Sequence, residues 1–170
     1  MKNIFYILFL LFTGASYGQV QSVSLQASGL TCSMCSRAIY KALQKVPDVA
    51  DVQEDIEHTS YHIRFNDPAA VSLESLKKAV KSAGFSVASM EVKVHFDQES
   101  VGNDSVVRLS SLQFQFVHVN HQNLNGVKSL LVVDKDYLLE KERKKYAGSY
   151  ESVPAPDGTG RIFHVTMSKS

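Results

Sequence analysis

The sequence predicts an α+β protein in two parts. A βαββαβ unit is expected over residues 20–96, and a linker over 97–104 joins it to a small, mostly-β unit of unknown function over 105–170. Three observations carry this prediction. Apolar and polar residues alternate as in strands in four segments of the first part. Two segments between them repeat apolar residues at helical spacing, and after residue 96 a polar stretch, DQESVGND, interrupts the pattern.

The first strand and the first helix flank a short turn that contains both cysteines of the chain. Alternation over residues 23–28 predicts a half-buried strand, which Gly29 ends. After the turn, helical spacing predicts a helix over residues 36–46, which the Pro-Asp pair at 47–48 ends. Its apolar stripe is expected to consist of Cys35, Ala38, Ile39, Ala42, Leu43 and Val46.

Three further strands and a second helix complete the first part. Alternation over residues 50–56 and 61–65 predicts two strands joined by a turn. Ser72 can cap a second helix, which Gly84 closes. A long alternating run over 88–96 predicts the fourth strand. The order β-α-β-β-α-β is that of the ferredoxin-like fold, an antiparallel sheet with both helices on one face.

The second part follows a different pattern and carries no recognisable motif. Alternation predicts strands over residues 112–116, 127–133 and 162–167, and residues 120–126 are expected to form a turn-rich loop. The charged run over 140–145 predicts a solvated helix. The sequence leaves open whether this part packs on the first sheet or extends it.

The first 18 residues predict a cleavable signal peptide. Lys2 supplies the positive charge, residues 4–12 form an apolar run too short to cross a bilayer, and Ser16-Tyr17-Gly18 fits a cleavage site. An uncleaved membrane anchor is the alternative. After cleavage the protein is expected to be soluble and either periplasmic or secreted. Cleavage leaves 17 basic and 17 acidic residues, and this balance of charge does not suggest a nucleic-acid partner.

The two cysteines, Cys32 and Cys35, are spaced to bind one ion. Thiolates are soft ligands that prefer Cu(I) to Mg²⁺ or Ca²⁺, and two sulfurs suit low-coordinate Cu(I) better than Zn²⁺, which takes four ligands. Cys35 lies at the start of a helix, where partial positive charge stabilises a thiolate. Cys32, on the loop, is expected to be more exposed, and Met34 between them to point outward. A two-ligand site also accepts a thiol from a partner protein, as a carrier requires.

Two other interpretations of the cysteine pair stay open. An exported chain meets oxidising conditions, so one alternative is an idle disulfide in a protein-interaction module. Alternatively, the pair is the redox centre of a thiol–disulfide oxidoreductase. Against redox catalysis, no tryptophan precedes the cysteines, and the order of elements is not that of thioredoxin.

Residues 29–35, GLTCSMC, resemble the GMTCxxC motif of heavy-metal-associated domains. Copper chaperones, copper-transporting P-type ATPases and periplasmic mercury-binding proteins share this domain, and the resemblance covers residues 20–96 only. It implies a ferredoxin-like metal-binding protein, not an enzyme, with Cys32 and Cys35 as ligands. Cu(I) is the expected ion, Hg(II) and Zn(II) are the alternatives, and a metal-accepting or metal-donating protein is the expected partner. Leu30 replaces the usual methionine of the motif, and Phe85 stands where bacterial members often carry tyrosine.

The six histidines predict no second metal site. His118 and His121 are three residues apart in a strand-like stretch, which places their side chains on opposite faces. His62, His95 and His164 are expected to be strand residues that face water.

Overall fold

The structure is a computed structural model that describes residues 19–30, 33–109, 111–146, 148 and 161–168. The predicted signal peptide over residues 1–18 and the predicted ligand Cys32 lie outside these residues. The first part contains β1 (Gln19–Ser28), α2 (Ser33–Gln44), β2 (Val49–Asp55), β3 (Ser60–Phe65), the 3₁₀ helix η2 (Pro68–Ala70), α3 (Leu73–Ser82) and β4 (Ser86–Val101). The second part contains β5 (Val106–Leu109), β6 (Leu112–Phe116), β7 (Gln122–Val132), α4 (Glu140–Arg143) and β8 (Ile162–Met167).

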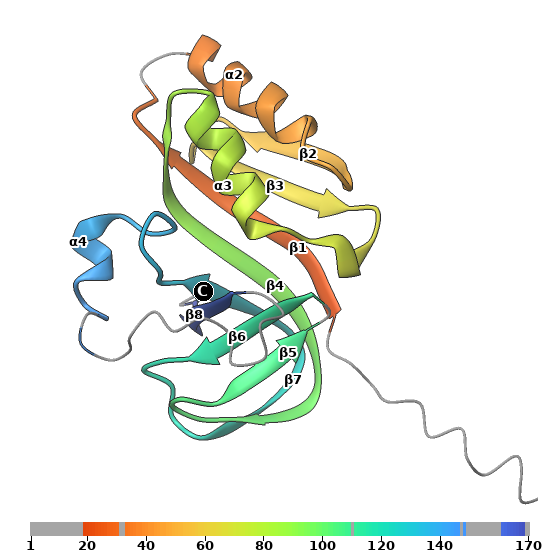
Figure 1. Cartoon of the computed structure of the whole chain (residues 1–170), viewed down its shortest axis with the longest axis vertical. Helices are drawn as coiled ribbons and strands as arrows, with labels where there is room; N and C mark the ends of the chain where they lie inside the picture. The colour runs from red at the N-terminus through yellow and green to blue at the C-terminus, as the bar shows by residue number, and fades with distance from the viewer. Residues whose placement is uncertain (1–18, 31–32, 110, 147, 149–160, 169–170) are drawn as a thin grey trace, which may run out of the picture.

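The strands of the described part form one eight-stranded sheet in the order β2-β3-β1-β4-β7-β8-β6-β5. Helices α2 and α3 lie beside one another on one face of the half that contains β1, β2 and β3 (Figure 1). Neighbouring strands are antiparallel, except that β6 and β8 run parallel. The chain is therefore α+β with a mostly-β remainder, as predicted, and its second part extends the first sheet.

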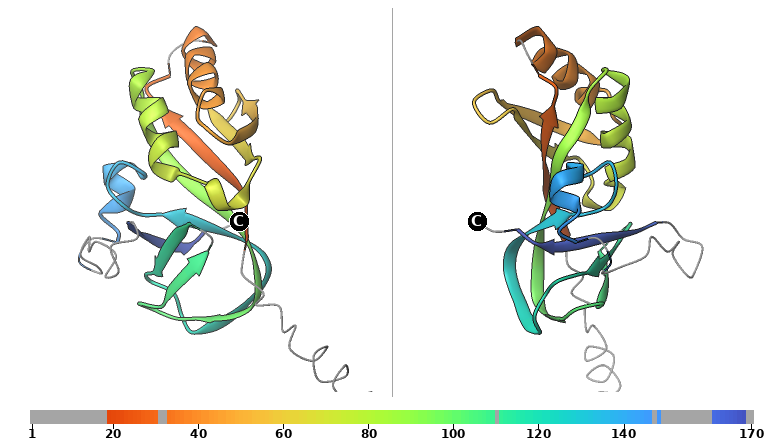
Figure 2. Two further views of the ribbon diagram at one scale, coloured as in Figure 1. Left: turned by 45° about the vertical axis from the view of Figure 1, so that its right-hand side comes forward. Right: turned by 90° about the vertical axis from the view of Figure 1, so that its left-hand side faces the viewer.

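Strand β4 occupies residues 97–101 of the linker that the sequence predicted over residues 97–104. It continues to Val101 and pairs with β7 from Glu91, opposite Leu131, to Val101, opposite Gln122. A register shift between Phe96 and Glu99 accommodates the polar stretch, and β4 runs through both halves of the molecule (Figure 2). The polar composition of this stretch suggested a break in the sheet. Composition does not show that another strand, β7, supplies partners for the backbone hydrogen bonds of this stretch.

Two other boundaries in the second part also differ from the prediction. Residues 120–126 are not a loop throughout, because β7 already begins at Gln122, where the extended β4 offers it a partner. Helix α4 covers only four residues of the charged run. Tyr137, which precedes this helix, is fully buried.

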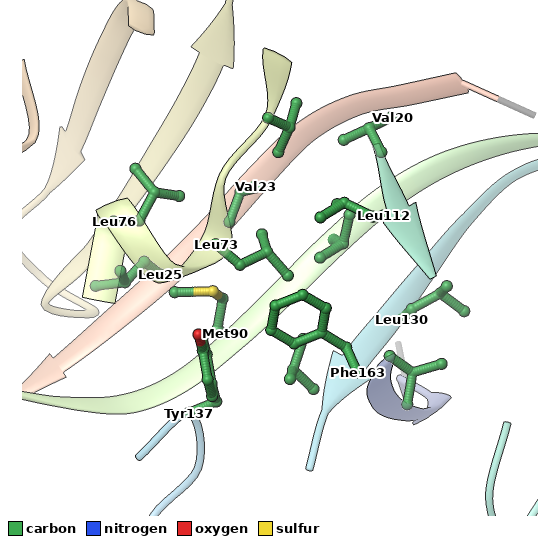
Figure 3. Close-up of a cluster of buried hydrophobic side chains, with 14 of the residues drawn as sticks. Val20, Val23, Leu25, Leu73, Leu76, Met90, Leu112, Leu130, Tyr137 and Phe163 are labelled. Atoms are coloured by element: carbon green, nitrogen blue, oxygen red, sulfur yellow. The ribbon is translucent and has the colours of Figure 1, made fainter. Parts of the chain in front are cut away.

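One apolar core joins the two parts. In Figure 3, Leu25, Leu73, Leu76 and Met90 of the first part lie in the same cluster as Leu112, Leu130, Tyr137 and Phe163 of the second. The same cluster reaches the buried apolar positions of α2 and α3 that face the sheet. Both parts are thus held together by burial of apolar surface as well as by the shared strand.

The prediction that His164 faces water is wrong. His164 is buried; its Nδ1 lies 2.9 Å from Oδ1 of Asp134, and its backbone N–H donates to Oδ2 of the same carboxylate at 2.9 Å. The second part of the chain also contains a small apolar cluster of its own, which consists of Val117, Val133 and Leu138. Strand β8 itself is buried on both faces, which alternation alone does not predict.

Candidate metal centre

The centre is built on the turn between β1 and α2. Gly29, directly after β1, adopts a φ of +86°, a conformation that glycine reaches without strain. Leu30 is half-buried and packs against the core, in the position where the motif usually has methionine. A Cβ at Gly29 would lie 3.9 Å from Cδ1 of Phe85, so the Phe85 ring flanks the start of the turn. Thr31 and Cys32 lie outside the described residues.

Cys35 is the predicted ligand that the structure describes, and it lies in the first turn of α2. Its side chain is half-buried, whereas the neighbouring Met34 is 80% exposed and points outward, as expected. Within the described helix, the first turn of α2 contains no acidic residue. The positive end of the helix dipole is therefore not offset by a carboxylate there, and it favours an anionic group such as a thiolate.

A buried tyrosine lies beneath this turn. Tyr61 of β3 is fully buried, and its hydroxyl donates to the carbonyl oxygen of Ser36 at 3.1 Å. Burial raises the pKa of Tyr61; the bond to Ser36 opposes this, and the nearby Glu54 carboxylate raises the pKa further. The hydroxyl therefore remains a hydrogen-bond donor at neutral pH.

The Tyr61–Ser36 contact was missed by the sequence reasoning. The predicted apolar stripe of the first helix included Ala38, which is exposed, and excluded Ser36, which is buried. Tyr61 itself could have indicated this contact. It occupies an inward position of an alternating strand, and a buried hydroxyl needs a hydrogen-bond partner.

A polar depression adjoins the first turn of α2, between this helix and the end of β2. Its volume is about 480 Å³, and it is lined by Ser33, Ser36, Arg37, Tyr40, Lys41, Gln44, Glu54 and Ile56. Arg37 and Lys41 are exposed, and Ile56, from the turn after β2, is 67% exposed. The surface beside the cysteine turn is thus accessible and mainly basic.

His118 and His121, which lie three residues apart in the sequence, have separate neighbours in the second part of the chain. His121 lies near Ser100 of β4, with Nε2 at 3.4 Å from Oγ, and His118 packs edge-on against Tyr146. Within residues 19–30, 33–109, 111–146, 148 and 161–168, no group of three or more His, Cys, Asp or Glu side chains is arranged to hold a metal ion. The helices of this described part include none that is long and apolar enough to span a membrane.

Known proteins resemble the part of the chain that contains this turn. The family model of the heavy-metal-associated domain matches residues 24–86. The mercuric transport protein periplasmic component of Serratia marcescens is 35% identical over 69 residues, which are 41% of this chain and 75% of that protein. The copper-exporting P-type ATPase of Bacillus subtilis is 26% identical over 81 residues, or 48% of this chain and 10% of that protein. Oxidized MerP from Ralstonia metallidurans CH34, a solved structure, is 37% identical and covers 40% of this chain and 96% of its own, with a TM-score of 0.36.

Proposed function

Because the chain belongs to the heavy-metal-associated domain family, we propose that it is an exported carrier of one soft metal ion held between Cys32 and Cys35. It buffers the ion or passes it to a metal-accepting protein, and it is not an enzyme. The observation that carries the proposal is the position of Cys35, the last residue of the motif over residues 29–35, which is half-buried in a helix turn without acidic side chains.

Cu(I) is the proposed ion. Two thiolates satisfy Cu(I) at low coordination number, whereas Zn(II) prefers four ligands. Hg(II) is also thiophilic, and the relatives include both a mercuric transport protein and a copper-exporting ATPase. The affinities of the protein for Cu(I) and for Hg(II) are therefore the ones to compare.

Transfer to a partner follows from the low coordination number. A thiolate of the partner adds to the bound ion, after which one thiolate of this chain leaves and takes up a proton from solvent. A second exchange of the same kind, with another ligand of the partner, displaces the remaining thiolate and completes the transfer. The ion keeps its oxidation state throughout, so no electron donor is required. The exposed, basic surface beside the turn leaves room for the partner to approach.

An exported location is part of the proposal. The expected signal peptide over residues 1–18 and the periplasmic relative from Serratia marcescens both support it. N-terminal sequencing of the mature protein from the exported fraction tests it, with Gln19 expected as the first residue.

A Cu(I) competition titration with a chromophoric chelator tests metal binding on the reduced mature protein. One tightly bound equivalent is expected, and the Cys32→Ser/Cys35→Ser variant is expected to lose it. Each single-serine variant should bind far more weakly than the parent because one thiolate remains. Equal affinity of the parent and the double variant would refute the proposed site. A parallel titration with Hg(II) compares the two ions on the same protein.

Thiol–disulfide exchange is the second candidate, because a thiol at a helix N-terminus is also suited to redox chemistry. An insulin-reduction assay and the reduction potential of the cysteine pair distinguish it from metal carriage. Turnover of insulin by the parent, lost in the double-serine variant, would favour the oxidoreductase. A stable disulfide without turnover excludes it.

A further inference from the structure

We propose that the buried hydroxyl of Tyr61 positions the metal centre. By donating to the carbonyl of Ser36, it fixes the first turn of α2 and thereby holds Cys35 in the arrangement that receives the ion. This inference rests on the proposed function, since it assigns a role to a residue that supports the same site. Tyr61 is a positioning residue and does not itself contact the ion.

The geometry places this hydrogen bond next to the predicted ligand. Tyr61 lies in the sheet opposite Leu25 of β1 and Glu54 of β2. Its hydroxyl reaches from the sheet to a helix residue 25 positions away in the sequence. Ser36 directly follows Cys35, so the bond connects the sheet to the backbone one residue from the thiol.

The bond is additional to those that form the helix. In an α-helix the Ser36 carbonyl accepts from the N–H four residues further along, which belongs to Tyr40. The carbonyl has a second lone pair for the Tyr61 hydroxyl. Loss of the hydroxyl thus leaves the Ser36 carbonyl with its helical partner, and the helix itself is expected to persist.

The turn is held from its other side as well. Leu30 packs against the core, and Phe85 flanks Gly29 at the end of β1. With Tyr61 fixing the helical end, both ends of the cysteine loop are attached to the sheet. Ends that are held in place lose less conformational entropy when the metal binds.

Tyr61→Phe tests the inference because it removes only the hydroxyl and keeps the buried ring. Tyr40→Phe is the matched control, because the Tyr40 hydroxyl lies on the same helix but accepts from Gln44 at 2.8 Å, away from the first turn. Cu(I) dissociation constants of the reduced mature proteins are measured by competition with the chelator. Amide hydrogen exchange of the metal-free proteins reports the protection of residues 37–40.

Tyr61→Phe is expected to weaken Cu(I) binding roughly 3- to 10-fold, the effect of about one lost hydrogen bond. Exchange at residues 37–40 is expected to accelerate by a similar factor, while Tyr40→Phe stays within about twofold of the parent in both measurements. Unchanged affinity in a folded Tyr61→Phe variant overturns the inference and leaves the proposed function intact. Equal losses in both variants, or loss of folding in Tyr61→Phe, also overturn it because they indicate a general effect on packing. A parent protein that binds no Cu(I) refutes the proposed function and this inference together.

Discussion

Tyr137 and Phe163 pack edge-on, with ring centroids 5.6 Å apart and ring planes at 86°. Tyr137 comes from the segment between β7 and α4, and Phe163 comes from β8. The Tyr137 ring also faces α3 of the first part, where Nζ of Lys77 lies 4.7 Å from its centroid. Packing of Tyr137 against α3 therefore joins the second part of the chain to the first part.

Tyr137→Ala is expected to lower the free energy of unfolding by about 3–5 kcal/mol, because it leaves a cavity in the shared core. Tyr137→Phe is the control for Tyr137→Ala, because it removes only the hydroxyl and keeps the ring. The buried hydroxyl lies near the Glu74 carboxylate but makes no hydrogen bond, so its removal is expected to change stability by less than about 1 kcal/mol. Urea unfolding of both variants measures this difference. A large loss in Tyr137→Phe would show that the hydroxyl is bonded in solution.

Gly29→Ala is expected to destabilise the turn between β1 and α2. The φ of +86° at Gly29 costs an L-residue about 1–2 kcal/mol. The added Cβ itself meets only an ordinary contact with Phe85 at 3.9 Å, so strain rather than a clash is the expected cause. The readouts are urea unfolding and the Cu(I) dissociation constant.

Gly102→Ala is the control for backbone strain. Its added Cβ also meets an ordinary contact, at 3.6 Å from Cδ2 of His121, but Gly102 does not have a positive φ. We expect a change below about 0.5 kcal/mol. If both alanine variants lost the same stability, backbone strain at Gly29 would not be the cause.

The sequence predicted the first part well because its signals are local. Alternation gives the strands, and Ser72 caps α3 as expected, with its Oγ accepting the N–H of Ser75 at 3.2 Å. The extension of β4 to Val101 was missed because its partner, β7, is distant in the sequence. The buried state of His164 was missed because β8 is buried on both faces, so that alternation along the strand does not separate inward from outward residues.

The candidate site was predictable only in part. The cysteine spacing identifies Cys35 at the start of α2, and the structure places it there. The roles of Cys35 and Cys32 as metal ligands remain predictions, and Cys32 also lies outside the described residues. The support from Tyr61 requires the register of β3 against β1 and β2, which places its hydroxyl beneath the helix and which no spacing rule supplies.

Glu74 is expected to make the stability of the protein depend on pH in the acidic range. Burial alone would raise the pKa of Glu74, but the hydrogen bond from Lys77, the nearby Tyr137 hydroxyl and the charges of Lys77 and Arg161 together hold it below its usual 4.5. Because the folded pKa is depressed, the stabilisation is present above pH 4.5 and is lost as the pH falls through the folded pKa. Glu74→Gln should therefore flatten the decline of the unfolding free energy below pH 4.5.

Glu142→Gln is the control for this pH dependence. The bond to Lys145 lowers the pKa of Glu142 as well, but that pair lies at the surface, where ion pairs contribute little. Unfolding free energies measured by urea from pH 3 to pH 7 are compared with those of the parent. A curve for Glu74→Gln that parallels the parent's would contradict the assigned role of Glu74.

Asp134→Asn is expected to destabilise the protein by about 2 kcal/mol, although the two side chains have nearly the same shape. One carboxylate oxygen accepts the backbone N–H of His164, and the other faces Nδ1 of its ring, both at 2.9 Å. An asparagine presents an oxygen to one of these groups and an NH₂ group to the other, so the second contact loses its acceptor. Asp136→Asn is the control, since Asp136 is an exposed partner of Lys81 at 3.7 Å and should change stability by less than about 0.5 kcal/mol. Urea unfolding measures both variants, and equal stability of Asp134→Asn and the parent would mean that the buried carboxylate is not needed as a double acceptor.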